Sequence, residues 1–314
     1  MESLVYLDSH FIEEHTDFPS LIEALQKAFA LGDITVPPRH HHALQADDAT
    51  LLLMPAWKAG EWVGVKVVNV FPENGKQDLP AIQGSYLLHD GKTGALQAVI
   101  DGKALTAKRT AATSALASFY LSRPDASSLL MIGTGALAPN LIRAHAAVRP
   151  IQEVWIWGRS QAKARKLCDA LKSEAFECHA IKDYTEVMPG VDIISCATLS
   201  PDPLILGKYL RKGQHIDLVG AFQPDRRESD DEVIRRSLVF VDTFQGMRES
   251  GDIAIPLKSG ILKVEDVKSD LFTLSSGQYP GRSSRETITM FKSVGHALED
   301  LVAAEYYFNQ YPHA

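Results

Sequence analysis

Apolar residues occur in short runs between residues 50 and 101, separated by turn-forming residues. This pattern predicts strands at 50–54, 61–71, 84–89 and 96–101. Pro55 and the Gly-containing stretches at 72–75 and 90–94 are expected to form the turns between them. Consecutive strands joined by short turns predict an antiparallel sheet. Before it, residues 20–31 have the helical spacing of apolar positions and follow Pro19, which suits a first helical turn.

The pattern of apolar positions changes at residue 128, after which predicted strands alternate with predicted helices. Strands are predicted at 128–132, 154–157, 178–181, 192–197, 215–219 and 238–241, helices at 138–148 and 161–171, and a short turn near Tyr209. This alternation predicts a doubly wound parallel sheet. An Ala-rich helix at 105–121 precedes it, and a long amphipathic helix at 287–309 is expected to return to the first part.

The predicted fold is therefore α/β with two domains. A Rossmann-type parallel sheet domain is expected at 121–296, and an α+β domain with an antiparallel sheet at 1–120 together with 297–314.

The turn after the first parallel strand has the pattern Gly-x-Gly-x-x-Ala at 133–138. Gly133 allows a sharp turn, Gly135 lets the backbone approach a phosphate, and Ala138 lets the helix and strand pack closely. The helix that follows offers free N–H groups and the positive end of its dipole to phosphates. We therefore predict that Gly133, Gly135, Ala136 and Leu137 bind a dinucleotide.

The second parallel strand ends at Gly158, followed by Arg159 and Ser160. NAD sites usually have an acidic residue at this position, which binds the ribose hydroxyls. An arginine can instead hold a 2′-phosphate through charge-assisted hydrogen bonds. Arg159 and Ser160 therefore predict NADPH as the cofactor, with NADH less favoured. The alternative is that Arg159 is a solvated loop cation.

Composition excludes several other classes of protein. The 314 residues are 45% hydrophobic and 23% charged, which is typical of a globular protein. A net charge of −7 argues against nucleic-acid binding, and no apolar run is long enough for a membrane span or a signal core. Three cysteines without Cys-x-x-Cys spacing fit a reducing compartment, so we expect a cytoplasmic protein. Consecutive residues 40–42 are all His, but their side chains alternate in direction, so no metal site is expected.

Several further segments together resemble the ornithine cyclodeaminase/mu-crystallin family. They are 54–55, 64–66, 72–74, 105–112, 219–221, 227–228, 249–252 and 291–295, in this order and spacing. The resemblance covers nearly the whole chain. It implies a homodimer whose antiparallel sheets meet across the interface, a separate dinucleotide-binding domain, and a site in the cleft between them for a small carboxylate-bearing imino or amino acid.

One departure distinguishes activities within this family. Ornithine cyclodeaminases carry an Asp directly after the segment equivalent to 219–221, whereas this chain has Phe222. Phenylalanine cannot act as a base, so the resemblance favours NADPH-dependent reduction of a small cyclic imino acid. The substrate would be delta-1-pyrroline-2-carboxylate or delta-1-piperideine-2-carboxylate, and the product L-proline or L-pipecolate. An ornithine cyclodeaminase, an amino-acid dehydrogenase such as alanine dehydrogenase, and a non-catalytic binding protein like mu-crystallin remain alternatives.

Lys66 and Arg109 are the expected catalytic residues. Lys66 lies among apolar residues, where an ammonium needs either an anion or an exposed edge. The resemblance implies that Lys66, Arg109 and Arg39 bind the substrate carboxylate, whereas Lys108 is expected to be a surface cation. The substrate arrives as an iminium, or Lys66 or a water protonates it.

The remaining candidates lie near the ends of the later strands. Ala197, Thr198, Val219, Gly220 and Ser293 are expected beside the nicotinamide, and Phe222 against the substrate ring. Cys196 is expected to be a buried small hydrophobe. Asp225 and Glu228 either orient site arginines or cap the following helix.

Overall fold

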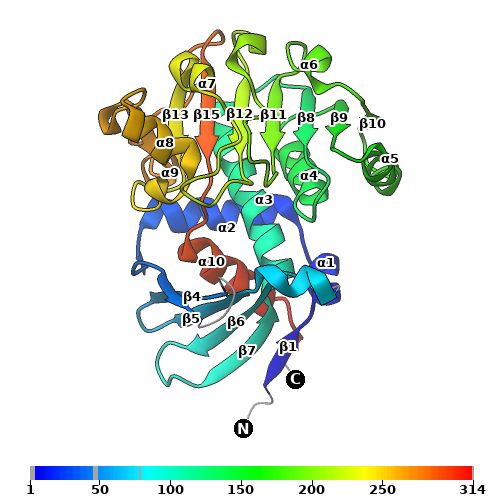
Figure 1. The fold of residues 1–314 in the computed structure, drawn as a ribbon. Coiled ribbons are helices and arrows are strands. Elements are labelled where there is room, and N and C mark those ends of the chain that lie inside the picture. The colour runs from blue at the N-terminus through cyan, green and yellow to red at the C-terminus, as the bar shows by residue number, and fades with distance from the viewer. Residues whose placement is uncertain (1–3, 45–48, 78, 313–314) are drawn as a thin grey trace. The chain divides into compact units, whose positions relative to one another are not determined.

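The structure, a computed structural model, describes residues 4–44, 49–77 and 79–312. It divides into two compact units. Unit 1 comprises Met1–Arg109 and His296–Ala314, and unit 2 comprises Thr110–Gly295. The boundary falls inside the long helix α3 (Gly102–Leu121), so residues 110–121 of this helix belong to unit 2. The predicted α/β fold class is confirmed: unit 1 contains a mainly antiparallel sheet and unit 2 a parallel one (Figure 1).

The sheet of unit 1 has the order β1-β7-β6-β5-β4-β2, and β3 also pairs with β4. Only the β1–β7 pair is parallel. The four predicted strands are present, and three short edge strands were not predicted. The strands are β1 (Val5–Leu7), β2 (Ile34–Thr35), β3 (His40–Ala43), β4 (Thr50–Lys58), β5 (Trp62–Val70), β6 (Ile82–Asp90) and β7 (Leu96–Asp101), and the helices are α1 (Ser9–Glu14), α2 (Phe18–Leu31) and α10 (Ala297–Phe308), with a 3-10 turn at Pro72–Gln77.

The prediction that β4 ends at Pro55 is wrong, because the strand continues to Lys58. Pro55 itself pairs with Val65 of β5. On the other side of β4, the pairing with β3 stops at Leu53 and the pairing with β2 starts at Trp57. Pro55 therefore lies in the gap between two edge strands, where its missing N–H group costs no ladder hydrogen bond.

The two faces of this sheet differ. Helix α10 packs on β4, β5 and β6, and the residues in cross-strand register beneath it are buried: Met54, Lys66, Tyr86 and Ile100. The opposite face carries a second row in register, Pro55, Val65, Leu87 and Val99. These four apolar side chains are only half-buried. Successive side chains of a strand point to opposite faces, so both faces of this sheet carry hydrophobic residues.

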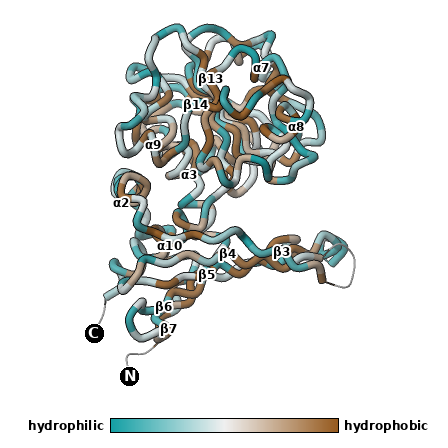
Figure 2. Tube along the Cα trace, turned by 90° about the vertical axis from the view of Figure 1, so that its left-hand side faces the viewer, coloured by the Kyte–Doolittle hydropathy of each residue, from teal (hydrophilic) through white to brown (hydrophobic). Residues whose placement is uncertain are grey.

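The sheet of unit 2 has eight parallel strands in the order β10-β9-β8-β11-β12-β15-β13-β14. The order reverses between β8 and β11. Such a reversal is where open α/β sheets bind ligands, beyond the carboxyl ends of the strands. The strands are β8 (Ser128–Ile132), β9 (Glu153–Trp157), β10 (Glu177–Ala180), β11 (Ile193–Cys196), β12 (His215–Leu218), β13 (Ser237–Val241), β14 (Val267–Asp270) and β15 (Ile288–Lys292). The strands of both sheets carry some of the most hydrophobic stretches of the chain (Figure 2).

Helices connect most of these strands (Figure 1). The predicted helices at 138–148 and 161–171 are present, and the predicted turn near Tyr209 is a 3-10 helix. The helices are α4 (Ala138–Val148), α5 (Gln161–Ala170), α6 (Tyr184–Val187), α7 (Asp231–Arg236), α8 (Gly251–Ser259) and α9 (Leu271–Ser275), with 3-10 turns at Gly207–Tyr209, Met247–Glu249 and Val264–Asp266.

The prediction of one helix over 287–309 is wrong in its first half. Residues Ile288–Lys292 form β15, which lies between β12 and β13, and α10 begins only at Ala297. All five residues of β15 are buried. A central parallel strand is apolar on both faces, so its sequence has no alternation that separates it from a buried helix.

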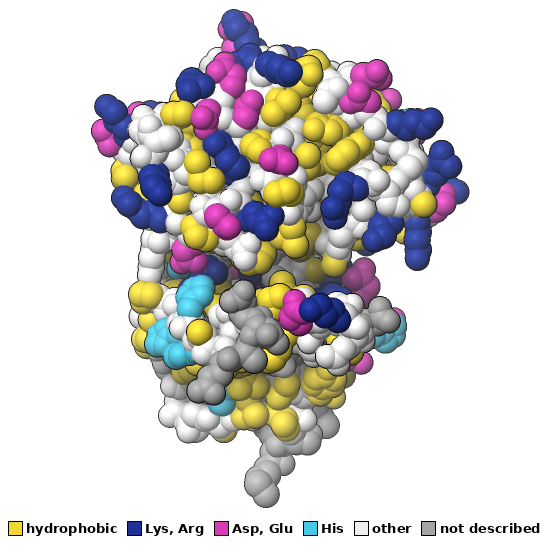
Figure 3. Space-filling model, in the orientation of Figure 1, with side chains coloured by type: hydrophobic (Ala, Val, Ile, Leu, Met, Phe, Trp, Pro, Cys, Tyr) yellow, Lys and Arg dark blue, Asp and Glu magenta, His cyan; other side chains and the backbone are white. Residues whose placement is uncertain are grey.

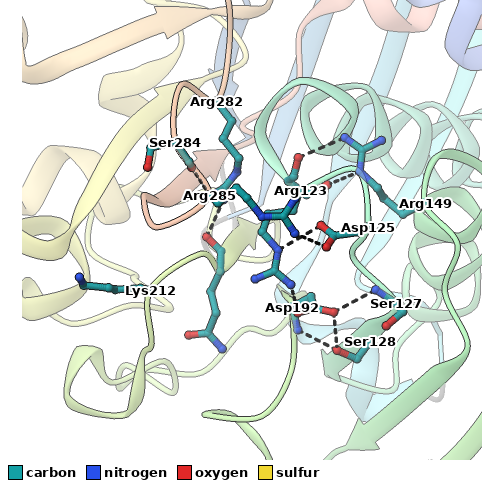
Figure 4. A network of polar contacts seen from close by, with 12 residues as sticks. Arg123, Asp125, Ser127, Ser128, Arg149, Asp192, Lys212, Arg282, Ser284 and Arg285 are labelled. Atoms are coloured by element: carbon teal, nitrogen blue, oxygen red, sulfur yellow. Dashed lines mark hydrogen bonds and ion pairs between the residues drawn. The ribbon is translucent and has the colours of Figure 1, made fainter.

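Salt bridges fix the amino ends of the unit 2 strands (Figure 4). Asp192, which precedes β11, accepts hydrogen bonds from the Arg123 guanidinium at 2.6 Å, the Ser127 backbone N–H at 2.9 Å and the Ser128 hydroxyl at 2.9 Å. Burial raises the pKa of Asp192, but these hydrogen bonds and the charge of Arg123 outweigh it and lower the pKa. Asp192 thus ties the starts of β8 and β11 together, at the edge opposite the switch point.

Candidate active site

Four charged side chains form a buried cluster in unit 1. The Lys66 ammonium lies 2.8 Å from Asp300 Oδ1 and 2.7 Å from Oδ2. The Arg109 guanidinium lies 2.9 Å from Asp300 Oδ1 through Nε and 2.5 Å from Glu299 Oε2 through Nη1. All four side chains are at most 6% exposed. Strand β5, helix α3 and the first turn of α10 each contribute to this cluster.

The charges of this cluster shift the pKa values of Asp300 and Lys66. Burial raises the pKa of Asp300, but the charges of Arg109 and Lys66 outweigh burial and hold that pKa below its ordinary value. Burial first, and then the neighbouring Arg109 charge, lower the pKa of Lys66 against the attraction of Asp300, and the net result is a pKa of about 8. Arg109 therefore stabilises Asp300 and destabilises the charged form of Lys66. Lys66 is the group in this cluster that releases a proton near neutral pH.

An anion was expected beside Lys66, and the Asp300 carboxylate of the same chain supplies one. Glu299 and Asp300 were not predicted as site residues, and they make the cluster formally neutral. A signal for them existed in the sequence: two buried cations require counter-charges. Nothing in sequence spacing, however, points to residues 234 positions away from Lys66. The alternative that Lys66 lies on an exposed edge is wrong, because it is 3% exposed between β4 and β6.

Arg39 is half-buried and directly precedes β3. The β3–β4 ladder ends with His40 opposite Leu53, so one more residue of the same register would place Arg39 opposite Met54. Met54 is in turn opposite Lys66. Directly opposite residues of an antiparallel pair point to the same face, so this extrapolated register would put Arg39 in the row of Lys66, two strands away.

The expectation that Lys108 is a surface cation is wrong. Its side chain is 3% exposed, its ammonium lies 2.6 Å from the Glu13 carboxylate, and it lies 5.7 Å above the Phe18 ring. The N-terminal helices, whose packing was not predicted, cover this face of α3. Adjacent Lys108 and Arg109 are thus both buried against carboxylates of unit 1.

In unit 2, the turn after β8 has the geometry of a phosphate cradle. Gly133 has φ of +124°, and a Cβ there would lie 2.6 Å from the Ala197 carbonyl oxygen at the end of β11. A Cβ on the exposed Gly135 would meet no heavy atom of the described residues within 4 Å, so open space lies over this backbone. No described side chain caps the start of α4 after Leu137. The Ala138 N–H is bonded to the Gly135 carbonyl at 3.1 Å and Pro139 has no N–H, so the Asn140 N–H is the first-turn group that can bind an anion. These features fit a dinucleotide pyrophosphate.

Arg159 lies beyond the carboxyl end of β9, next to the exposed basic residues Lys163, Arg165 and Lys166 of α5. Figure 3 shows lysine and arginine side chains gathered over this part of unit 2. The Ser160 hydroxyl oxygen caps α5 by accepting the Lys163 N–H at 3.4 Å. Its own hydrogen stays available for a phosphate oxygen.

The remaining predicted residues lie beyond β11, β12 and β15. Ala197 and Thr198 follow β11, Val219 and Gly220 follow β12, and Ser293 follows β15. These three strands are neighbours in the sheet, so the structure brings the five residues to one edge. Phe222 follows at the same edge and is 41% exposed. Cys196 is fully buried, as predicted, and burial raises the pKa of its thiol well above the ordinary value.

Neither role expected for Glu228 is the observed one. Asp230, not Glu228, caps α7, by accepting the Val233 N–H at 3.0 Å. Glu228 is fully buried and accepts hydrogen bonds from backbone N–H groups at the ends of β11 and β12. Asp225 is exposed.

Two other features are absent from the described residues, a metal-binding cluster and a membrane-spanning helix. No three His, Cys, Asp or Glu side chains between residues 4–44, 49–77 and 79–312 are grouped as a metal ion would require. Within the same ranges, no helix combines the length and apolar character needed to cross a bilayer.

The model of the ornithine cyclodeaminase/mu-crystallin family matches residues 3–313 of this sequence. The chain belongs to this family. The family resemblance inferred from short segments is thereby confirmed over almost the entire length.

Individual members of the family and solved structures similar to this chain have named activities. A Delta(1)-pyrroline-2-carboxylate reductase of Paracoccus denitrificans is 38% identical over 259 residues, which cover 82% of each chain. The Thermococcus litoralis Delta(1)-pyrroline-2-carboxylate reductase, solved in complex with NADH and L-proline, superposes with a TM-score of 0.92 at 33% identity and covers 98% of this chain and 97% of its own. An archaeal alanine dehydrogenase dimer with bound NAD superposes with a TM-score of 0.90 at 28% identity, covering 98% and 96%. The family relationship therefore supports a nicotinamide cofactor for this chain.

Proposed function

We propose that this protein reduces a small cyclic imino acid to the amino acid, with NADPH as the reductant. The observation that carries the proposal is the buried cluster of Lys66, Arg109 and Asp300. It combines guanidinium and ammonium donors for a carboxylate with a group that gives up a proton near neutral pH. A solved relative bound to NADH and L-proline supports the same chemistry.

Each residue has a defined part in this proposal. Arg109, Arg39 and Lys66 bind the substrate carboxylate, which fixes the adjacent C=N bond. A reduced nicotinamide, when bound, supplies a hydride to the carbon of that bond. The imine nitrogen takes a proton from the Lys66 ammonium and becomes the amine, and solvent then returns a proton to Lys66. Phe222 offers an apolar surface to the substrate ring and cannot supply the base that cyclodeaminases use.

The direct test compares substrates in a single assay. We expect NADPH oxidation with delta-1-pyrroline-2-carboxylate or delta-1-piperideine-2-carboxylate, and no ammonia release from ornithine. Absorbance at the NADPH band and an ammonia assay provide the two readouts. Ammonia release from ornithine without net cofactor turnover would reassign the protein as a cyclodeaminase. NADPH binding without turnover of any imino acid would indicate a binding protein.

The protonation of Lys66 predicts the pH dependence of kcat/KM. Only the ammonium form can donate a proton, so kcat/KM should fall as the pH rises above about 8, the pKa of Lys66. Asp300→Asn removes an attraction that raises the Lys66 pKa, so the fall should move to lower pH. The matched control, Glu23→Gln, breaks an exposed ion pair with Lys27 and should leave the profile unchanged. A profile that does not move in Asp300→Asn would assign the titration to the substrate imine instead.

The preference for NADPH rests on the end of β9. Gly158 leaves no carboxylate there to repel a 2′-phosphate, and Arg159 and Ser160 supply a cation and a hydroxyl donor. The exposed basic residues of α5 extend the positive charge around this position.

Arg159→Asp should shift the ratio of kcat/KM for NADPH over NADH toward NADH by about tenfold or more, since it exchanges attraction for repulsion at the 2′-phosphate. Parallel kinetics with the two cofactors measure this ratio. Arg165→Asp makes the same charge change in the second turn of α5 and serves as the control. An equal response of the two variants would remove Arg159 from the cofactor site.

We further infer that two copies of the chain pair through the half-buried sheet face of unit 1. The row Pro55, Val65, Leu87 and Val99 is apolar across four strands, which is unusual for a surface facing water. A structural neighbour described as a dimer supports a second copy as its occupant.

Val65→Asp places a charge at the centre of this row and should convert the dimer into monomers. Sedimentation equilibrium gives the mass directly. Leu31→Asp, at a 69% exposed apolar position of α2, should leave the mass at that of two chains. A dimer that persists in Val65→Asp would place the interface elsewhere.

A further inference from the structure

The Glu228 carboxylate connects the ends of two neighbouring strands. Its Oε1 accepts the Thr198 backbone N–H at 2.8 Å and the Thr198 hydroxyl at 3.2 Å. Its Oε2 accepts the Gly220 N–H at 2.7 Å and the Ala221 N–H at 3.3 Å. Thr198 follows β11 and Gly220 follows β12, so a single side chain fixes the backbone where both strands end.

The segment that carries Glu228 is itself held in place. Asp252 Oδ1 accepts the N–H groups of Glu228 at 2.9 Å and Ser229 at 3.1 Å. The Lys292 ammonium lies 3.5 Å from Asp252 Oδ2 and 4.0 Å from Glu228 Oε2. The side chains of Glu228, Asp252 and Lys292 are all fully buried. A buried lysine between two carboxylates thus supports the Glu228 contacts from β15.

The two strand ends are also in close backbone contact. A Cβ at Gly220 would lie 2.1 Å from the Thr198 carbonyl oxygen and 2.2 Å from the Thr198 nitrogen. No side chain fits there, and neither strand end can shift without moving the other. A change in how Glu228 binds these N–H groups is therefore transmitted to both ends.

We propose that Glu228 is a positioning residue for the nicotinamide half of the cofactor. In a doubly wound sheet a dinucleotide lies across the switch point, with one half on each side. The glycine turn and Arg159 lie on the β8–β9 side, where the proposed adenosine contacts are. Thr198 and Gly220 lie on the β11–β12 side, which leaves them to the nicotinamide half. The inference rests on dinucleotide binding by unit 2 and not on the identity of the substrate.

The protonation state of Glu228 should modulate this positioning. Burial raises the pKa of Glu228, Lys292 lowers it, and Asp252 raises it. The net pKa is about 7. Three groups face it: Lys292 from β15, Asp252 from α8 and Cys196 from β11, whose thiol stays neutral because burial raises its pKa. A protonated carboxyl carries an O–H donor on one oxygen and accepts more weakly there, so it holds the N–H groups at one of the two strand ends less tightly.

The experiment compares a whole cofactor with its adenosine half. Isothermal titration calorimetry measures the affinities of NADPH and of 2′-phospho-ADP-ribose, which lacks the nicotinamide. Glu228→Gln keeps the size of the side chain but turns one acceptor oxygen into an N–H donor that faces other donors. We expect NADPH binding to weaken about tenfold or more, and 2′-phospho-ADP-ribose binding to change by less than about twofold. Glu265→Gln, an exposed carboxylate of the same unit, should change neither affinity.

A merely structural role for Glu228 gives a different result. It would weaken both ligands equally, or leave both unchanged in a folded variant, and either outcome would overturn the proposal. If Glu228→Gln does not fold, the proposal is tested by measuring the pH dependence of ligand binding to the unmodified protein. Its ratio of NADPH to 2′-phospho-ADP-ribose affinity should fall as the pH decreases from 8 to 6, because the 2′-phosphate is common to both ligands and cancels. A ratio that stays constant over this range would reject the assignment.

Discussion

The Lys66 ammonium is buried in the centre of the unit 1 sheet and depends on the Asp300 carboxylate to remain charged there. Taking an ammonium out of water costs several kcal/mol unless a hydrogen-bonded counter-ion replaces the lost hydration. Asp300 lies in the first turn of α10, where the helix dipole also favours a negative charge. The pair therefore links α10 to the middle of β5. Removing either partner would leave an uncompensated charge inside the unit.

Burial, and then the charge of Arg109, make Lys66 unusually acidic in spite of this pair. Asp300 is shared with Arg109, and the nearby guanidinium opposes a second positive charge. A lysine that paired with Asp300 alone would hold its proton more tightly. The pKa of Lys66 is about 8 because burial and the Arg109 charge together outweigh the attraction of the carboxylates. This arrangement is the physical basis of the proposed reduction, in which a proton and a hydride must reach the same C=N bond.

Unit 2 also buries a lysine beside carboxylates, but there the charges have a different role. Lys292 at the end of β15 lies between Asp252 and Glu228. The Glu228 carboxylate accepts hydrogen bonds from backbone N–H groups. There the charges hold strand ends in place. Buried charged residues therefore stand in two settings: in unit 1 they include the donors proposed for the substrate carboxylate, and in unit 2 they fix the backbone beside the predicted cofactor site.

Local sequence determined the elements whose pattern is complete within a few residues. The four central strands of unit 1, the turn at Gly133 and the first parallel strands were predicted because alternation, turn residues and glycine spacing are local signals. β15 was mistaken for part of a helix because a strand buried on both faces has no such alternation. Pro55 was mistaken for a strand end because its tolerance depends on where the edge strands β2 and β3 pair with β4, and that is set by segments elsewhere in the chain.

For the site, the sequence by itself determined which residues are candidates for the proposed chemistry: the cations Lys66 and Arg109, the glycines of the dinucleotide turn, Arg159 in place of an acid, and Phe222 in place of a base. Only the tertiary structure decided what those charges face. Asp300 and Glu299 meet Lys66 and Arg109 from the opposite end of the chain, and Glu228 binds two strand ends instead of capping a helix. The reason is that a counter-charge acts through distance in space, and separation along the sequence carries no information about that distance once the chain has folded.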